Sequence, residues 1–420
     1  MSIITSLKNR VLRNRMLLSN FSYISIFQML NIIIPLIIYP YLIRVVGKGL
    51  YGEIVIAQSI MFYFTIIINY GFNVSATKSI SEYRGNWKLK NEIVNSVYAI
   101  KLGLFLFSFA IITIITLIRF EFIIPHKILI ILTAHLCLFE FIFPLWYFQG
   151  IEKMKYVTII NMLSKVSIIP LFFLFVKSSE KYYLVPLING IGSIITVLAV
   201  MYVMIRLEGI RFSYKYAKKI GYCLKKGTPI FYTRLIAVFK DRSNILLIGV
   251  FLKPSDAAIY DLAFKIVNLV LNIFYNFSNV LFPNISANKD FTKYRKIIMY
   301  TCFISFIIML LLFIFSPLAV KLLGGIEMVE AVVVLRILSV MIIFSTFSSL
   351  LGIPLLIKNQ IKTYLRNSIY TTSFYFLLVI VALIFLNVDI LVISCFLPLT
   401  IAFEAAHRYF YYRKLNLENG

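Results

Sequence analysis

Twelve long apolar runs constrain this chain more than any other feature of its sequence. Each has about 20 residues or more, the length that an α-helix needs to cross the hydrocarbon core of a bilayer. Only 14% of the 420 residues are charged, against about a quarter in a soluble domain. The sequence therefore predicts an all-α polytopic membrane protein with twelve transmembrane helices. The runs fall near residues 20–43, 54–76, 93–118, 128–149, 156–176, 182–205, 228–252, 259–282, 297–319, 330–357, 361–386 and 389–410.

Lysine and arginine residues are unevenly distributed between the connecting segments. With the N-terminus inside the cell, the cytoplasmic segments hold 26 of them and the outer segments 8. Positive residues collect on the cytoplasmic side of membrane proteins, so both termini are predicted to be cytoplasmic. The net charge of +25 is then a topology signal, and no nucleic-acid partner is expected.

The longest connector, RLEGIRFSYKYAKKIGYCLKK, separates two sets of six spans. We therefore expect an N-terminal six-helix lobe at 1–205, a basic cytoplasmic linker at 206–227 and a C-terminal six-helix lobe at 228–420. Aligning Tyr51 with Tyr260 gives the two halves a weak similarity in the same direction. Parallel repeats of this kind are one of the known transporter plans, with the substrate held between the halves.

Charged residues inside the spans are the main candidates for function. A charge at the middle of a membrane helix costs about 2.5 to 3.5 kcal/mol on insertion scales, so these side chains must face protein or water. The acids are fewer than the cations and comprise Glu140, Asp241, Asp261 and Glu404. The cations are Lys101, Lys165, Arg234, Lys240, Arg242, Lys265, Arg336 and Arg366.

Some of these charges have a purely structural interpretation. Asp261 and Lys265, like Glu404 and Arg408, are four residues apart and are expected to form ion pairs within one helix. Arg366 lies near the end of its span, from which its side chain can extend to the interface.

The remaining cations predict a cationic, water-filled cavity that binds an anionic substrate such as a phosphate or diphosphate. At about 100° per residue, Asp241 lies nearly under Arg234, and the predicted water-facing side of the seventh span extends to position 245. The expected substrate-binding residues are Lys101, Lys165, Arg234, Lys240, Arg242 and Arg336.

Asp241 and Glu140 are the mid-span acids expected to couple transport to a proton or Na⁺, although Asp241 also suits simple neutralisation of its flanking cations. The chain has no GxxxxGK[ST] phosphate loop, and its histidines and cysteines lack metal-ligand spacing. We therefore expect a transporter without catalytic residues, metal or cofactor.

One stretch carries a family resemblance. Residues 144–177 read PLWYFQGIEKMKYVTIINMLSKVSIIPLFFLFVK. This stretch resembles the central part of the Wzx-type polysaccharide flippases, which belong to the multidrug/oligosaccharidyl-lipid/polysaccharide exporter superfamily. VVGKGLYG, NYGFNVSATKSIS and IYDLAFKI are weaker matches, and the final third of the chain is similar mainly in hydropathy. Trp146, Gln149 and Gly150 within this stretch have two interpretations. They form either an interfacial aromatic belt with a glycine turn or a cytoplasmic gate.

The resemblance implies two six-helix bundles around a central cationic cavity. It also implies a bacterial inner-membrane flippase that moves undecaprenyl-diphosphate-linked O-antigen, or related surface polysaccharide, repeat units from the cytoplasmic to the periplasmic leaflet by alternating access. Other O-antigen assembly proteins are candidate partners. The alternative is an ion-coupled multidrug or organic-ion antiporter of the same superfamily.

Overall fold

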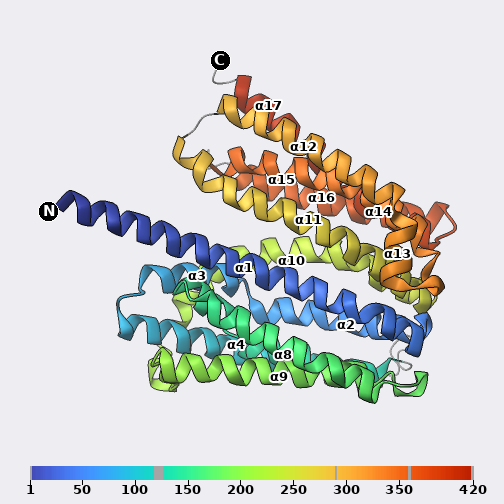
Figure 1. Cartoon of the computed structure of the whole chain (residues 1–420), viewed down its shortest axis with the longest axis horizontal. Helices are drawn as coiled ribbons and strands as arrows, with labels where there is room; N and C mark the ends of the chain where they lie inside the picture. The colour runs from blue at the N-terminus through green and yellow to red at the C-terminus, as the bar shows by residue number, and fades with distance from the viewer. Residues whose placement is uncertain (1, 118–125, 289–290, 358–360, 418–420) are drawn as a thin grey trace. The chain divides into compact units, whose positions relative to one another are not determined.

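The computed structural model describes residues 2–117, 126–288, 291–357 and 361–417, which are almost entirely helical (Figure 1). No strand occurs in these ranges, and the predicted all-α class is confirmed. The α-helices are α1 (Ser2–Val46), α2 (Lys48–Asn69), α3 (Phe72–Glu82), α4 (Trp87–Leu117), α5 (Lys127–Thr133), α6 (His135–Ile142), α7 (Leu145–Gly150), α8 (Met154–Phe175), α9 (Leu184–Tyr202), α10 (Ile220–Phe251), α11 (Pro254–Asn288), α12 (Phe291–Ile314), α13 (Ser316–Gly324), α14 (Ala331–Ser339), α15 (Met341–Ile357), α16 (Ile361–Phe385) and α17 (Ile390–Leu417).

Eleven helical segments of the described residues are long and apolar enough to cross a membrane. They coincide with eleven of the twelve predicted spans. The segments are Ser22–Val46, Lys48–Glu82, Trp87–Leu117, Lys127–Gly150, Met154–Phe175, Ser179–Leu207, Pro254–Ser278, Tyr294–Ile314, Ala331–Leu355, Leu365–Phe385 and Ile390–Lys414.

The remaining predicted span, 228–252, lies within α10. This helix is continuous over 32 residues, which is long enough to cross a bilayer. It differs from the other eleven in carrying Arg234, Lys240, Asp241 and Arg242 in its apolar part. The predicted helix is confirmed, and its crossing of the membrane stays a prediction.

Two predicted spans are broken at residues that disfavour helical backbone. Phe143, between α6 and α7, has an extended ψ of 117°, as expected for a residue that precedes a proline. Tyr70 and Gly71 have positive φ angles of 47° and 76° and separate α2 from α3. A Cβ atom at Gly71 would lie 2.8 Å from the side chain of Ile230, so glycine is required there for close approach as well as for backbone conformation.

The helices group into two compact units. Unit 1 contains residues 1–34 and 60–235, and unit 2 contains residues 35–59 and 236–420. The boundaries fall inside α1, α2 and α10. The lobes expected from the sequence begin and end at loops instead, and they stay a prediction.

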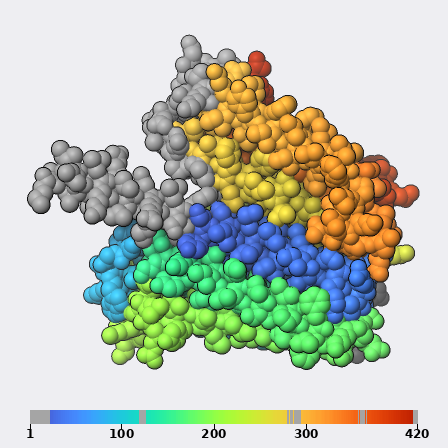
Figure 2. All heavy atoms as spheres, in the orientation of Figure 1, coloured from blue at the N-terminus to red at the C-terminus, as the bar shows by residue number. Residues whose placement is uncertain are grey.

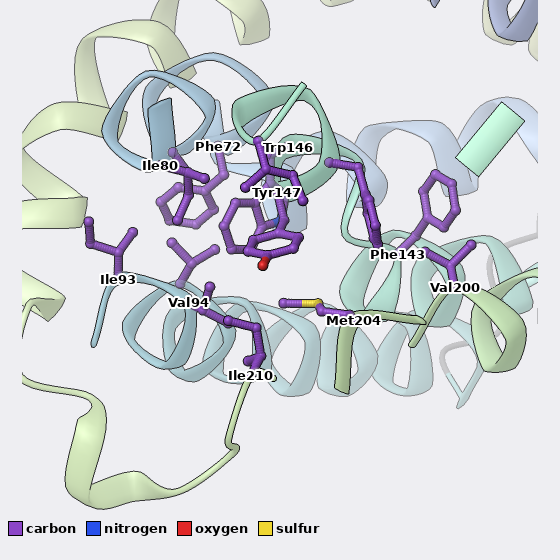
Figure 3. Packing of buried hydrophobic residues seen from close by; sticks show 14 of the residues in the cluster. Phe72, Ile80, Ile93, Val94, Phe143, Trp146, Tyr147, Val200, Met204 and Ile210 are labelled. Carbon is purple, nitrogen blue, oxygen red and sulfur yellow. The ribbon is translucent and has the colours of Figure 1, made fainter. Parts of the chain in front are cut away.

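The core of unit 1 gathers around the short helix α7. Figure 3 shows Trp146 and Tyr147 in a cluster with Ile80 of α3 and Val94 of α4, and these four side chains are almost completely buried. The helices α8 and α9 pack side by side in the same unit (Figure 2). The broken fourth span thus places a compact aromatic segment inside the unit.

Unit 2 is held together by α15, which packs against α11, α12 and α17. A buried polar network joins further helices of the unit. The side-chain amide of Asn244 in α10 donates to the Tyr260 hydroxyl at 2.8 Å and to the Ile393 carbonyl at 3.0 Å, and it accepts from the Tyr375 hydroxyl at 2.5 Å. Because buried polar groups are costly when unpaired, this network favours one packing arrangement of α10, α11, α16 and α17.

Candidate functional site

Lys101 is fully buried in unit 1 and is already neutralised by an acid. Its amine lies 3.5 Å from a carboxylate oxygen of Glu140 and also donates to the Glu140 backbone carbonyl. The same carboxylate accepts a hydrogen bond of 2.7 Å from Asn69. The sequence predicts a substrate site at Lys101 and an ion-coupling site at Glu140. The structure brings the two residues together as an ion pair, with Glu140 24% exposed, and both roles stay predictions.

We expect Lys101→Met to reduce the amount of folded protein, because it leaves the Glu140 carboxylate without its cation, a change that costs about 3 to 5 kcal/mol for a buried pair. The Lys101→Met, Glu140→Gln double variant removes both charges, and its abundance should recover. Membrane abundance and thermal unfolding in detergent measure this. A double variant as unstable as the single one would contradict the pairing, and a folded double variant that transports normally would exclude Glu140 from ion coupling.

Lys165 of α8 is a cation whose neighbour is neutral. Its amine lies 2.5 Å from the side-chain oxygen of Asn31 in α1, and the Asn31 amide group donates to the Phe27 carbonyl at 2.7 Å. No carboxylate forms an ion pair with Lys165 among the described residues. The side chain is half-buried. Lys165 therefore keeps a positive charge that the described part of unit 1 does not neutralise.

Arg234 is the second such cation in unit 1. It lies in α10, its side chain is exposed, and it has no ion-pair partner within the part of the chain that the structure describes. The guanidinium group of an exposed arginine offers five N–H donors to an anion.

Unit 2 carries a cluster of charges around Glu404. One oxygen of this carboxylate lies 2.7 Å from Arg408 and accepts a hydrogen bond of 2.9 Å from Ser348. The other lies 3.3 Å from the amine of Lys240, which is also 3.8 Å from Asp241. Lys240 is 11% exposed and Arg408 is 7% exposed. Glu404 thus binds two nearly buried cations from two helices.

Asp241 lies between two cations of α10. It is 3.8 Å from the amine of Lys240 and interacts electrostatically with Arg242. Asp241 is the more accessible acid, at 48% exposure against 16% for Glu404.

The predicted water-facing side of α10 is shorter than expected. Position 245 was assigned to that side, but Ile245 is only 1% exposed. Asn244, one residue earlier, is completely buried in the polar network described above. After Arg242, packing within unit 2 therefore buries residues of α10 that helical periodicity assigns to the water-facing side.

Arg336 contacts the end of a helix. Its guanidinium donates to the hydroxyl of Ser316 at 3.0 Å and to the carbonyl of Phe313 at 3.4 Å, and it lies 5.1 Å from the centre of the Phe313 ring. The last carbonyls of α12 lack partners within their own helix, and a cation is stabilising at that end. This contact gives Arg336 a structural role, and its predicted substrate contact stays untested.

The two ion pairs expected within single helices are confirmed. Lys265 pairs with Asp261 one turn earlier, and its amine lies over the rings of Tyr39 and Tyr51 at 5.1 and 5.8 Å. Arg408 pairs with Glu404. The exposed Arg366 donates to the Tyr411 hydroxyl at 2.6 Å, and its extension to the membrane interface stays a prediction.

The segment from Trp146 to Gly150 is an internal packing element. Trp146 is completely buried, which does not suit an aromatic belt whose rings face the lipid headgroups. A Cβ atom at Gly150 would lie 2.7 Å from Ile80 and 2.9 Å from the Thr77 carbonyl. Thr77 also donates to the Trp146 carbonyl at 3.1 Å and lies 3.5 Å from the Gln149 side-chain oxygen. The tight contact between α3 and α7 is compatible with a gate, which stays a prediction.

Arg84 stabilises this contact and was not identified from the sequence. Its guanidinium donates to the Gly150 carbonyl at 2.8 Å and forms an ion pair of 2.9 Å with Glu152. Glu152 has a positive φ of 59°, a conformation that is uncommon for a residue with a side chain. Glu152 lies within the stretch 144–177 that resembles the flippase family. It thus forms an ion pair with an arginine from a connector 68 positions earlier.

Solved structures with a similar fold are transporters. An inward-facing multidrug resistance MATE family transporter of the MOP superfamily gives a TM-score of 0.65 over 91% of this chain and 97% of that chain, at 15% identity. The lipid II flippase MurJ, in its inward closed conformation, gives 0.66 over 87% and 85%, also at 15% identity. The chain therefore has the helical fold of the MOP-superfamily transporters.

Residues 17–289 match the polysaccharide biosynthesis protein family, and the chain belongs to that family. A protein of Escherichia coli (strain K12) named "Putative O-antigen transporter" is 24% identical over 349 residues, covering 82% of this chain and 84% of the relative. A protein of the same name from Shigella dysenteriae is 22% identical over 272 residues, covering 64% and 67%. The family resemblance predicted from the sequence is confirmed.

Proposed function

We propose that the chain is a flippase that moves undecaprenyl-diphosphate-linked O-antigen, or related surface polysaccharide, repeat units across the bacterial inner membrane. Membership of the polysaccharide biosynthesis protein family and the names of the two relatives support this substrate class. The similarity to a lipid II flippase supports a fold suited to moving lipid-linked saccharides. Both termini are proposed to be cytoplasmic, with other O-antigen assembly proteins as candidate partners.

The observation that carries the proposal is the environment of Lys165. A lysine inside a 22-residue apolar helix is costly to insert, and its contact is the uncharged side chain of Asn31. A structural lysine would be expected to pair with an acid, as Lys101 and Lys265 do. A lysine kept for a phosphate is instead expected to leave its charge available to an incoming anion.

The proposed mechanism is alternating access without ATP hydrolysis. The proposed diphosphate contacts in unit 1 are Lys165 and Arg234, which form no ion pair with a described acid, and the proposed contact in unit 2 is Lys240. The isoprenoid tail remains in lipid, and Tyr, Asn and Ser side chains contact the sugars. Asp241 and Glu140 are proposed to bind the coupling proton or Na⁺, since both acids lie within apolar helical segments and their side chains are partly exposed, at 48% and 24%.

A multidrug or organic-ion antiporter remains the second candidate, because a MATE family transporter shares the fold. A version that expels cations is disfavoured by charge. Its binding site needs an excess of acids to attract cationic substrates, whereas the candidate residues described in unit 1 carry an excess of cations, since Glu140 is paired with Lys101 and Lys165 contacts a neutral side chain.

Transport of a radiolabelled lipid-linked oligosaccharide into inverted membrane vesicles tests the proposal. We expect Lys165→Gln to reduce transport about 10-fold to 100-fold, because one charged contact contributes about 1.5 to 3 kcal/mol. Lys165→Arg should retain part of the activity, since the positive charge remains. The matched control is Lys155→Gln, which removes an exposed lysine near the start of the same helix and should transport normally.

Two results would contradict the proposal. Vesicles that accumulate organic cations but not the lipid-linked oligosaccharide would establish the antiporter instead. Equal transport by the Lys165→Gln variant and the parent chain would move the anion site away from α8, with Arg234 as the next residue to test.

A further inference from the structure

A cavity of about 770 Å³ lies in unit 2 between α12, α15 and α17. Much of its lining is apolar and includes Ile298, Phe344 and Leu351. Ile298 and Leu351 also belong to a buried hydrophobic cluster with Tyr294 and Tyr412. The Tyr294 hydroxyl donates to the Leu350 carbonyl at 2.6 Å and fixes α12 against α15. The cavity is therefore built on a packed core of the unit.

The cavity lining also contains two cations. They are Arg295 of α12 and Arg413 of α17, which line the cavity together with Tyr409 and Tyr412. Both arginines are exposed, and neither forms an ion pair with any described acid. Arginine binds phosphate through two parallel N–H donors, so two arginines at one opening can hold a single phosphate group.

The two arginines lie near the ends of their helices. Arg295 is four residues after the start of α12 (Phe291–Ile314), and Arg413 is four residues before the end of α17 (Ile390–Leu417). From Arg295 the cavity lining continues along α12 to Cys302, about 10 Å further along the helix axis. The cavity thus has cations near the helix ends and apolar side chains further along the same helices.

We propose that this cavity binds an anionic glycerophospholipid of the surrounding membrane, separately from the transported substrate. The phosphodiester binds Arg295 and Arg413, and the first part of one acyl chain lies against Ile298, Phe344 and Leu351. Basic pockets between membrane helices on the cytoplasmic side bind anionic headgroups, and the predicted topology puts this end of α12 and α17 in the cytoplasm. An apolar wall about 10 Å long suits part of an acyl chain rather than a long isoprenoid.

Native mass spectrometry of the purified full-length chain in detergent tests the assignment. With phosphatidylglycerol and phosphatidylcholine supplied equally, we expect one phosphatidylglycerol to be retained in preference. The Arg295→Gln, Arg413→Gln variant should lose at least about 10-fold in affinity for phosphatidylglycerol, and the corresponding Lys variant should lose less. The matched control removes two exposed cations of unit 1 (Lys155→Gln, Arg206→Gln) and should bind as the parent does.

Cys302→Trp separates a lipid from a simple anion, because it fills the apolar wall and leaves the arginines in place. We expect it to weaken phosphatidylglycerol binding while the chain stays monodisperse. Three results would each overturn the assignment. Phosphatidylcholine could be retained equally, inorganic phosphate could displace the lipid, or an equal amount of undecaprenyl phosphate could displace it preferentially. The readout is lipid binding alone, so it is independent of transport.

Discussion

A Gly52→Ala variant is expected to lose most of its folded protein, whereas Gly49→Ala is expected to be at least as stable as the parent chain. Both glycines lie in α2, three residues apart. A Cβ atom at Gly52 would lie 1.7 Å from the carbonyl oxygen of Pro254 and 2.4 Å from its carbonyl carbon. Backbone atoms cannot rotate away as side chains do, so α2 and the start of α11 would have to separate within unit 2.

The two expected effects have opposite signs. At Gly52 we expect a loss of about 3 kcal/mol, at the upper end for overpacked sites. At Gly49 no atom lies within 4 Å of the added Cβ, so alanine should gain about 0.5 to 1 kcal/mol of helix propensity. Thermal unfolding in detergent and abundance in the membrane measure both variants. Similar stability of the two variants would mean that α2 and α11 are not in contact at Gly52.

These glycines show what a sequence motif leaves open. VVGKGLYG contains three glycines and enters the family resemblance as a single motif. In the structure Gly47 has a positive φ of 84° and ends α1, Gly49 has open space around it, and Gly52 is packed against Pro254. Their spacing is visible in the sequence. The backbone angle and the approach of α11, 200 residues later, are not.

The fold was predictable where hydrophobicity alone decides it. Eleven runs of apolar residues correspond to eleven helical spans, because the length of a span is set by bilayer thickness. The breaks at Phe143 and Tyr70 were not predicted, although Pro144 and Gly71 offered local signals for them. The unit boundaries inside α1, α2 and α10 depend on long-range packing, which apolar runs do not encode.

For the candidate site, local pairs were predictable and distant partners were not. The pair Asp261–Lys265 follows from helical spacing. Lys101 and Glu140 are 39 positions apart, Lys165 and Asn31 are 134 apart, and Lys240 and Glu404 are 164 apart. Each of these contacts depends on which helices are neighbours. The sequence could therefore count the surplus cations, but it could not tell Lys101, which is paired, from Lys165, which lacks an acid.

We expect Glu404→Gln and Lys240→Gln to fail in different ways, although the two side chains are in contact. Removing the Glu404 carboxylate leaves Lys240 and Arg408 nearly buried without their shared acid, and breaking a buried ion pair in this way costs about 3 to 5 kcal/mol. We therefore expect little folded Glu404→Gln protein. Removing Lys240 leaves Glu404 bound to Arg408 and Ser348, so Lys240→Gln should accumulate nearly normally.

Lys240→Gln should instead lose surface polysaccharide. The substitution removes a positive charge that lies 3.3 Å from Glu404 and 3.8 Å from Asp241. A diphosphate would then lose a charged contact worth about 1.5 to 3 kcal/mol, or about 10-fold to 100-fold in binding. Lys240→Glu should be worse because repulsion is added, and Lys240→Arg should retain partial function.

A structural role and a binding role can be separated by measuring membrane abundance and O-antigen display together. Both are measured for these variants and for Asp241→Ala. A binding role predicts that display falls at constant abundance for Lys240→Gln and Arg242→Gln. A structural role predicts that display falls only in proportion to abundance, with Asp241→Ala among the least abundant variants because it removes the acid that interacts with both Lys240 and Arg242. If Lys240→Gln keeps full display, the anion site does not include this cluster, and the cations without acids in unit 1, Lys165 and Arg234, must bind the diphosphate alone.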